Sequence, residues 1–362
     1  MFPANKKIRV LVTDDSMLAR TMISNGLNSS PRIEVVGTAI NAMDARAKID
    51  QLKPDVMTLD VEMPGMSGID FVKQLLPSVP LPVVLVSSLD LRVFDALSAG
   101  AVDFVRKPDP GKNEAFIRAL TGKVIAAAGA KVRPRAGGPG PSAHASGGPR
   151  LPTTGNKPAL PAPPLLGNRP SMDATIIALG ASTGGTEATL EVMKRLPADI
   201  PPMLIVQHMP TGFTQMYADR LNRLCHMEVR EAKNGDELRR GLALLAPADL
   251  QMRVVRSGTR YTVTCTPGEK VSGHRPSVDA LFFSVAEQVK CKMAGIIMTG
   301  MGRDGADGLL KMRQAGAYTI GQDKESSVVY GMPMVAYNIG AVQIQGSCEN
   351  IAGILLRQLQ KW

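Results

Sequence analysis

Three residues of the C-terminal half have side chains that could act together as nucleophile, base and acid. Ser182 lies in the run GASTG, residues 180–184, a G-x-S-x-G pattern where an apolar run turns into a helical one. His208 ends the next apolar run, PMLIVQHM, and Asp304 follows AGIIMTGMG. A serine becomes nucleophilic when a base takes its proton, and a carboxylate on the far side of an imidazole fixes its tautomer. The pattern predicts a Ser182–His208–Asp304 triad.

Each of these residues also has an alternative interpretation. The run GASTGG could cap a helix or cradle a phosphate, although no Lys-Ser/Thr follows it and the G-x-G-x-x-G spacing is missing. His208 could be a core histidine and Asp304 a loop cap. The order Ser, His, Asp differs from that of α/β-hydrolases, so the motif does not predict that fold. His274, in SGHRPSVD, belongs to a capping arrangement or contacts substrate.

A second group of polar side chains lies in the N-terminal part, again after apolar runs. Asp14 and Asp15 follow the first run, Asp60 the third, Ser87 the fourth and Lys107 the fifth. Carboxylates brought together repel one another unless a cation neutralises them, and a hard ion with oxygen ligands, such as Mg²⁺, suits this set. Taken singly, the aspartates could be helix caps and Lys107 an ordinary loop cation.

The elements that must position both groups are alternating strands and helices. From residue 7 to residue 129, five continuous apolar runs alternate with five helical patterns, which predicts a doubly wound parallel sheet of flavodoxin type. The alternation resumes at Ala174, with a stretch of hairpin character from Met227 to Thr266. The predicted fold class is α/β with two doubly wound parallel-sheet domains, the second Rossmann-like with an antiparallel hairpin insertion. Both polar groups then lie at strand carboxyl ends.

Composition predicts how these domains are joined. Residues 130–172 contain 10 Pro and 7 Gly among 43 residues and carry six of the ten net positive charges. This segment is typical of a flexible linker, so we expect domains at 1–129 and 173–362. Its charges could contact an acidic partner or a membrane surface, but solvation explains them more simply. The folded parts are near neutral, which argues against nucleic-acid binding.

Composition also bears on the cellular compartment. The chain has no apolar run long enough to cross a membrane and no signal-peptide pattern at its start, so we expect a cytoplasmic protein without a transmembrane segment. Four scattered cysteines without metal spacing predict neither a disulfide nor a zinc site.

Residues 7–125 resemble the receiver domain of two-component response regulators. The resemblance rests on the Asp pair after the first strand, the Asp before VEMPGMSG, the hydroxyl after strand four and the Lys-Pro after strand five. It implies that Asp60 accepts a phosphoryl group. It also implies roles for the neighbouring residues: Asp14 and Asp15 hold Mg²⁺ with Asp60 and the Glu62 carbonyl, Ser87 and Lys107 contact phosphoryl oxygens, and Phe104 reorients on activation.

Residues 174–345 resemble the chemotaxis protein-glutamate methylesterase family, CheB. The motifs are IALGASTGGTEA, VQHMPTGFT, HRPSVD, TGMGRDGADG and VVYGMP, in that order. The resemblance implies that the triad hydrolyses glutamate methyl esters and deamidates glutamines on chemoreceptors without a cofactor, and that Thr183 and Met301 line the pocket. It also implies phosphorylation by a chemotaxis histidine kinase, which loosens a receiver packed over the catalytic cleft. The chain departs from the family in its long linker and in Gln251, where a histidine is expected.

Three other interpretations remain open. The second domain could be a catalytically idle binding module, in which case replacing Ser182 would alter only packing. A DNA-binding regulator would need a compact basic helix-turn-helix, which the near-neutral α/β pattern does not predict. The same esterase could also serve a signalling system other than chemotaxis, with identical chemistry.

Overall fold

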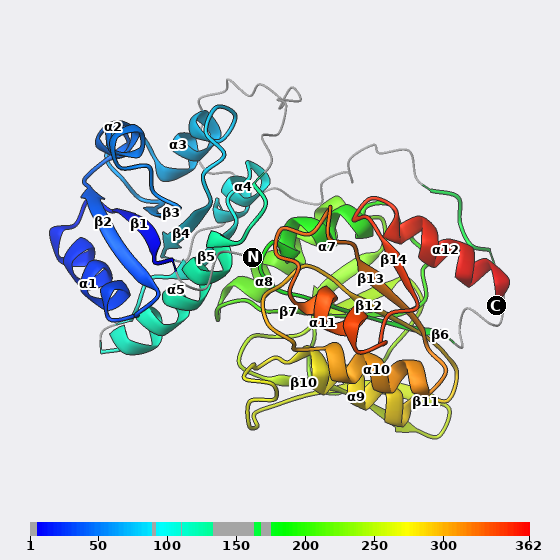
Figure 1. Ribbon diagram of the computed structural model, residues 1–362. Coiled ribbons are helices and arrows are strands. Elements are labelled where there is room, and N and C mark those ends of the chain that lie inside the picture. Colours follow the sequence, from blue (N-terminus) through cyan, green and yellow to red (C-terminus); the bar gives the residue numbers. More distant parts are fainter. Residues whose placement is uncertain (1–5, 89–91, 110, 133–162, 168–174) are drawn as a thin grey trace, which may run out of the picture. The chain divides into compact units, whose positions relative to one another are not determined.

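The structure is a computed structural model of the 362-residue chain, and it describes residues 6–88, 92–109, 111–132, 163–167 and 175–362 (Figure 1). The chain divides into two compact units, residues 1–159 and 160–362. Most of the predicted linker, residues 133–162 and 168–172, lies outside the described residues.

The first unit is a five-stranded parallel sheet with the order β2-β1-β3-β4-β5. Its strands are short apolar runs, and the residues of β3 and β4 are all buried, as expected for a sheet covered on both faces. The strand order reverses between β1 and β3, and open α/β sheets bind ligands at the carboxyl ends of the strands that flank such a reversal. The strands are β1 (Ile8–Thr13), β2 (Ile33–Ala39), β3 (Val56–Asp60), β4 (Val83–Ser87) and β5 (Asp103–Arg106).

Five helices cover this sheet, with α1 and α5 on one face and α2, α3 and α4 on the other (Figure 1). Side chains cap three of them: Ser16, Asn41 and Ser67 each accept a backbone N–H of the first turn, which a helix cannot satisfy internally. The helices are α1 (Met17–Asn28), α2 (Ala42–Leu52), α3 (Gly68–Leu75), α4 (Val93–Ser98) and α5 (Asn113–Ala128).

The second unit is a seven-stranded sheet with the order β14-β13-β12-β6-β7-β9-β8, in which every pairing is parallel. Its central strand β6 is buried at all seven positions. The strands are β6 (Thr175–Ala181), β7 (Met203–Gln207), β8 (Glu228–Glu231), β9 (Leu242–Leu245), β12 (Lys292–Ile297), β13 (Tyr318–Gln322) and β14 (Ile344–Gly346).

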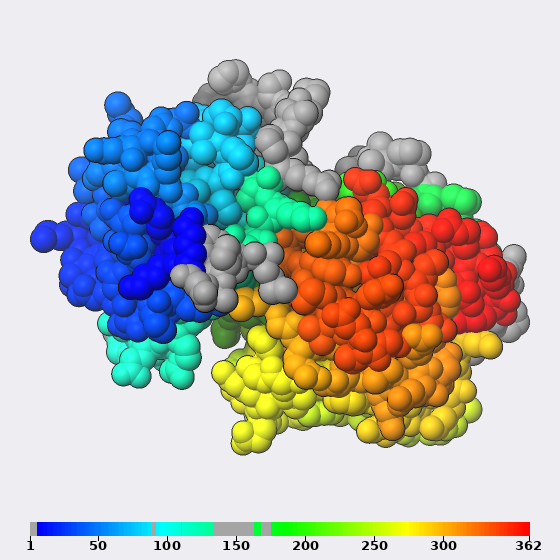
Figure 2. All heavy atoms as spheres, viewed as in Figure 1, coloured from blue at the N-terminus to red at the C-terminus, as the bar shows by residue number. Residues whose placement is uncertain are grey.

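Helices cover both faces of this second sheet. In Figure 1, α9, α10 and α11 lie on one face, and α7, α8 and α12 lie on the other. An antiparallel hairpin, β10 (Gln251–Ser257) and β11 (Arg260–Thr266), packs against α9 and lies along one edge of the unit (Figure 2, yellow-green to yellow). The helices are α7 (Gly185–Met193), α8 (Phe213–Leu224), α9 (Val278–Gln288), α10 (Ala306–Gln314), α11 (Met332–Asn338) and α12 (Ile351–Lys361).

These two sheets confirm the predicted fold class, with one refinement to the insertion. The hairpin is confined to β10 and β11, whereas β8 and β9, within the stretch expected to have hairpin character, join the main sheet in parallel. Parallel neighbours need a crossover connection. Here the connection between β8 and β9 pairs with β11, through hydrogen bonds such as Gly235 N–H to the Val263 carbonyl at 2.8 Å.

A short described piece of the predicted linker contacts the second unit. The backbone N–H groups of Leu166 and Gly167 donate to the Asp199 carboxylate at 3.0 and 3.1 Å, and Arg240 donates to the Gly167 carbonyl at 2.6 Å. Residues 163–167 therefore lie against this unit.

Two further observations bear on the chemistry open to the chain. Among the described residues, no helix has the length and apolar character needed to cross a membrane. All four cysteines are free thiols, and burial raises the pKa of the Cys265 and Cys348 thiols to about 12. Those two cysteines are therefore poor thiolate nucleophiles at neutral pH.

Candidate active site

The candidate active site lies where the strand order of the second sheet reverses. The chain runs outward from β6 through β7, then returns to place β12 beside β6 before continuing to β13. Ser182 directly follows β6, His208 directly follows β7, and Asp304 lies in the turn after β12. Because all three strands are parallel, their carboxyl ends meet at one edge of the sheet, in the crevice where open α/β sheets bind ligands.

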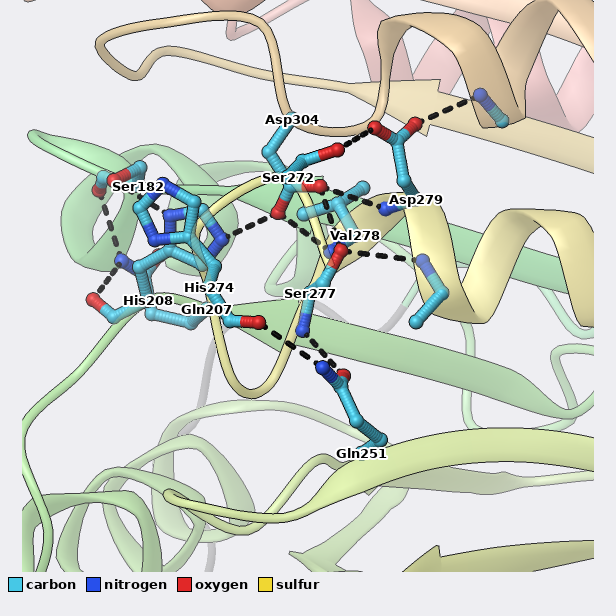
Figure 3. Close-up of polar contacts among 12 residues, drawn as sticks. Ser182, Gln207, His208, Gln251, Ser272, His274, Ser277, Val278, Asp279 and Asp304 are labelled. Atoms are coloured by element: carbon cyan, nitrogen blue, oxygen red, sulfur yellow. Dashed lines mark hydrogen bonds and ion pairs between the residues drawn. The ribbon is translucent and has the colours of Figure 1, made fainter. Parts of the chain in front are cut away.

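These three side chains form a continuous hydrogen-bonded line (Figure 3). Ser182 Oγ lies 3.1 Å from His208 Nδ1, and His208 Nε2 lies 2.8 Å from Asp304 Oδ2. Since the carboxylate can only accept, Nε2 carries the proton and Nδ1 is left as the acceptor for the serine hydroxyl. The geometry is therefore that of a serine prepared for deprotonation by a correctly oriented imidazole.

The turn that holds Ser182 depends on a glycine. Gly184 has φ +75°, and a Cβ there would lie 2.5 Å from Val328 Cβ, so both conformation and space require glycine. Ser182 itself does not have the positive φ, which non-glycine residues of the described chain show only at Lys53, Asp249 and Ser272. The sharp turn is thus made two residues after the nucleophile rather than at it.

The loop after β12 packs directly against the nucleophile. A Cβ at Gly300 would lie 2.7 Å from Ser182 Cβ and 2.3 Å from Met332 Sδ. The Ser182 N–H donates to the Thr299 carbonyl at 2.9 Å, and Thr299 Oγ1 donates to the Thr183 carbonyl at 2.9 Å. The serine's own amide is therefore already hydrogen bonded within the fold.

Gln207, which the sequence interpretation missed, joins the nucleophile's turn to the strand of the base. Its Nε2 donates to the Ser182 carbonyl at 2.8 Å and to the His208 carbonyl at 3.2 Å, and the side chain is buried. The available signal was a glutamine ending an otherwise apolar buried strand, where a polar side chain needs a partner.

Asp304 is held at the N-terminus of α9. Oδ1 accepts from the Ser277 hydroxyl at 2.7 Å and from Asp279 N–H at 2.9 Å, while Oδ2 accepts from Val278 N–H at 2.8 Å. Burial alone would raise the pKa of Asp304. The hydrogen bond and charge of His208, together with the Asp279 amide and the Ser277 hydroxyl, outweigh burial and lower that pKa below its ordinary value. The acid is therefore ionised throughout the neutral range.

A second carboxylate, Asp279, lies close to Asp304 but is turned away from the imidazole. It accepts from the Ser272 hydroxyl at 2.6 Å and from Gly308 N–H at 2.7 Å. Burial raises the pKa of Asp279, and the charge of Asp304 raises it further, although those two hydrogen bonds oppose the change. The predicted capping arrangement is present as well, because Ser277 Oγ accepts Ala280 N–H at 3.2 Å.

The three predicted pocket residues lie in different environments. The His274 ring stacks on the His208 ring, with centroids 3.8 Å apart and planes inclined by 10° (Figure 3). Thr183 is buried beside the nucleophile, and Met301 is 42% exposed, one residue after the glycine that touches Ser182. Met301 thus follows the loop glycine that packs against Ser182, and its own side chain faces solvent.

In the first unit, the acidic residues expected at the strand ends come together. Carboxylate oxygens of Asp14, Asp15 and Asp60 lie within 4.8 Å of one another. Lys107 Nζ lies 2.7 Å from Asp60 Oδ2 and 3.9 Å from Asp14 Oδ2. Burial raises the pKa of both Asp14 and Asp60 despite the attraction of Lys107. Their ionised forms therefore destabilise the fold, and a bound cation would reduce that destabilisation.

The donor set of this cluster fits a magnesium ion and a phosphoryl group. Two buried polar atoms there, Asp14 Oδ2 and Ser87 Oγ, have no hydrogen-bond partner among the described residues. Buried polar atoms are normally satisfied, so both atoms are suited to a ligand. Three carboxylates are the hard oxygen ligands that Mg²⁺ prefers.

Two other residues of the first unit, for which the sequence predicts a role, flank this cluster. The Glu62 side chain is exposed and accepts from the Ser88 hydroxyl at 2.5 Å, and its backbone N–H donates to Asp60 Oδ1 at 3.0 Å. Its carboxylate thus lies outside the three-acid group. Phe104 is buried and packs edge-to-face on Phe94, with centroids 6.3 Å apart.

The two folds and their strand-end residues define a class of protein, a response-regulator receiver joined to an α/β serine hydrolase. Comparison with known families agrees. Residues 10–118 match the response regulator receiver domain, and residues 177–355 match the CheB methylesterase family.

Whole-chain relatives extend this agreement. The chain is 49% identical, over 98% of its length and 99% of the relative, to protein-glutamate methylesterase/protein-glutamine glutaminase 2 of Syntrophomonas wolfei. It is 47% identical to the corresponding protein of Syntrophotalea carbinolica, over 96% of each chain. The crystal structure of the Thermotoga maritima CheB methylesterase catalytic domain matches 51% of this chain and 97% of its own, with 33% identity and a TM-score of 0.50.

The chain therefore belongs to the CheB family of protein-glutamate methylesterases/protein-glutamine glutaminases. It is a carboxylic ester hydrolase that carries a response-regulator receiver.

Proposed function

We propose that this protein removes methyl groups from glutamate γ-methyl esters of chemoreceptors, and deamidates glutamines at such sites, under the control of phosphorylation. The observation that carries the proposal is the unbroken line from Ser182 Oγ through His208 to Asp304, at 3.1 and 2.8 Å. The substrate class comes from the relatives, which are named for protein glutamate methyl esters and protein glutamine.

The first half of the reaction forms an acyl-enzyme. Ser182 Oγ attacks the ester carbonyl carbon while His208 Nδ1 accepts the hydroxyl proton. Asp304, ionised and bonded to Nε2–H, stabilises the resulting imidazolium. As the C–O bond to methoxide breaks, Nδ1 returns the proton to the leaving oxygen and methanol departs.

The second half regenerates the serine. His208 Nδ1 takes a proton from water, whose oxygen attacks the acyl carbon, and Ser182 leaves with the proton. The product from an ester is glutamate. A glutamine side chain follows the same route with ammonia as the leaving group, so one site serves both activities.

The oxyanion that develops needs donors other than the Ser182 amide, which is bonded to Thr299. The Thr299 hydroxyl also donates to the Thr183 carbonyl. The Gly184 N–H belongs to the same trans peptide group, so it points away from Thr299. We assign the amide of Gly184 to this role, because hydrogen-bond donors aimed at developing charge lower the barrier.

In the receiver, we propose Asp60 as the acceptor of a phosphoryl group from a chemotaxis histidine kinase. Asp14, Asp15 and Asp60 would hold Mg²⁺ together with the Glu62 carbonyl, and the ion would offset anionic charge on the phosphoryl group. Ser87 Oγ and Lys107 Nζ would contact phosphoryl oxygens, and Phe104 would reorient on activation. The orphaned Ser87 hydroxyl supports this assignment.

The proposed domain limits are 1–129 for the receiver, 130–172 for the linker and 173–362 for the esterase. We propose that the protein works in the cytoplasm at arrays of membrane receptors, with methylated chemoreceptors as substrate and without nucleic acid. Hydrolysis by the triad needs no cofactor, so Mg²⁺ belongs to the receiver alone.

The decisive experiment measures methanol release from methylated receptor membranes. Wild type, Ser182→Ala and Asp60→Ala are compared with and without a small phosphodonor and Mg²⁺. We expect release by wild type, none by Ser182→Ala, and acceleration by phosphodonor only when Asp60 is present.

Other outcomes would contradict parts of the proposal. Full activity of Ser182→Ala would show that the triad assignment is wrong. Absence of methanol in every condition would favour a binding module or a different ester, and stimulation of Asp60→Ala would show that regulation does not run through Asp60.

A further inference from the structure

Gln251, the first residue of β10, is a fully buried side chain whose polar atoms are all engaged. Its Nε2 donates to the carbonyls of Glu269 and His274, both at 3.0 Å, and its Oε1 accepts Ser277 N–H at 2.9 Å. A carboxamide offers two N–H donors and one oxygen, so this amide can take only one orientation here. Its removal would leave three backbone groups without partners in a buried region.

Two of those partners bracket a four-residue segment, residues 274–277, that touches the triad twice. At one end, the His274 ring stacks on His208, the base. At the other end, the Ser277 hydroxyl donates to Asp304, the acid, at 2.7 Å. Gln251 therefore holds both ends of the segment that lies against the base and the acid (Figure 3).

We infer that Gln251 is a positioning residue of the esterase. It fixes the position of His274 against the base, His208, and the position of Ser277 and the start of α9 against the acid, Asp304. The inference rests on the proposed roles of the triad. Gln251 touches none of the three triad side chains in the hydrogen bonds described, and acts through the segment it holds. Displacements of about 1 Å at a reacting group can cost about 100-fold in rate, so loss of this support reaches the chemistry.

A purely structural role is the competing explanation, and the chain offers a matched control for it. Ser284 also joins β10 to α9: its buried hydroxyl accepts Val254 N–H at 2.9 Å and donates to the Leu281 carbonyl at 2.7 Å. It makes no hydrogen bond with residues 274–277. Ser284→Ala therefore weakens the same strand-to-helix packing without releasing the segment.

The test uses the full chain and two readouts of Ser182. One is the rate of covalent labelling by a small fluorophosphonate, which requires the triad but no receptor contacts. The other is kcat and KM for methanol release from receptor membranes. Wild type is compared with Gln251→Leu, Gln251→His and Ser284→Ala, and thermal unfolding is measured for each.

We expect Gln251→Leu to label Ser182 about 10- to 100-fold more slowly, with kcat reduced and KM little changed. Ser284→Ala should also lose stability yet label at the wild-type rate. A neutral imidazole has one donor and one acceptor, so Gln251→His can keep the bond to Ser277 and one carbonyl. That variant should recover to within about threefold of wild type, a difference of under about 1 kcal/mol.

Three results would overturn the inference while leaving the proposed function intact. Equal labelling rates for wild type and Gln251→Leu would show that residues 274–277 keep their position without Gln251. An equal slowing in Ser284→Ala, or no rescue by Gln251→His in a folded variant, would reduce Gln251 to a packing residue. A wild-type protein that neither labels at Ser182 nor releases methanol would instead overturn the proposed function, and the inference with it.

Discussion

Asp304 Oδ2 lies 2.8 Å from the backbone nitrogen of Val278, the first residue of α9. The acid that orients the base is thus seated on the N-terminus of a helix, where free N–H groups and the helix dipole favour negative charge. The same oxygen also accepts His208 Nε2–H at 2.8 Å. The carboxylate can therefore be ionised while almost completely buried, which an isolated buried charge could not be.

Replacement of Asp304 by asparagine should disable the base, His208, because asparagine keeps the shape of the aspartate side chain but not its charge. An amide can present an N–H toward Nε2 and so favour the tautomer in which Nδ1 carries the proton, which cannot accept from Ser182. We expect kcat to fall about 10⁴-fold, the scale known for this change in serine proteases. Methanol release measures it, and Asp307→Asn, which removes only an exposed ion pair with Arg303, should leave kcat unchanged.

The stability of the catalytic unit should depend on Asp304 at acid pH. Its pKa is lowered in the folded protein, so the unfolded chain binds the proton first and the carboxylate stabilises the fold above its ordinary pKa. That contribution should fade as pH falls through the ordinary range and below it.

Urea unfolding at a series of pH values measures this effect. Fluorescence of Trp362, the single tryptophan, reports on the second unit, where it lies near Lys292. The difference in unfolding free energy between wild type and Asp304→Asn should shrink as pH drops. A difference that stays constant, or grows, down to the lowest pH with folded protein would contradict the prediction.

Gly300→Ala should damage activity more than stability. The added methyl group would sit 2.7 Å from Ser182 Cβ and 2.3 Å from Met332 Sδ, so the methionine or the nucleophile must move. We expect kcat to fall about 100-fold, as for a displacement of about 1 Å, while the protein stays folded. Gly353→Ala in α12 is the control. A Cβ at Gly353 would lie 3.4 Å from the Arg357 guanidinium, an ordinary contact, so this variant should keep full activity.

The stacked His274 ring should support His208 mainly by covering its face. Aromatic pairs contribute about 0.5–1.5 kcal/mol, so His274→Ala should lower kcat/KM by about tenfold. His274→Phe retains a ring that can stack and should stay within about threefold of wild type. Methanol release distinguishes these cases, and equal losses in both variants would point to a specific role for the imidazole nitrogens.

In the receiver, Asp14→Asn should stabilise the metal-free fold. Burial raises the pKa of Asp14, so its ionised form destabilises the fold at neutral pH, and a neutral amide removes that penalty. Mg²⁺ at 100 times its Kd should add about 2.7 kcal/mol to the wild-type receiver and much less to the variant.

Calorimetry with and without Mg²⁺ tests this prediction, with Asp50→Asn, an exposed site on α2, as the charge-matched control. A magnesium-dependent rise of equal size in Asp14→Asn and in wild type would exclude Asp14 from the ion site.

The sequence predicted the fold class because the relevant signals are local. Short, continuous apolar runs such as the all-buried β6 are typical of strands covered on both faces, and their alternation with helical patterns predicts parallel sheets. Parallel strands bring their carboxyl ends to one edge, which is why Ser182, His208 and Asp304 could be proposed as neighbours across 122 residues.

Local pattern did not resolve where the insertion ends. The stretch from Met227 to Thr266 contains the expected hairpin, β10 and β11, but β8 and β9 within it pair in parallel in the main sheet. The loop between them pairs with β11, which is a contact between distant segments. Periodicity within one run contains no information about such a pairing.

What the sequence determined by itself is the residue types and the strand ends on which they lie. Only the tertiary structure decided which groups support them: Gln207 and Thr299 around the nucleophile, and Ser277 and Gln251 behind the acid. These contacts join residues up to 116 positions apart. Hydrogen bonds act over about 3 Å, so each depends on the relative placement of whole strands and helices, which packing of the complete core sets.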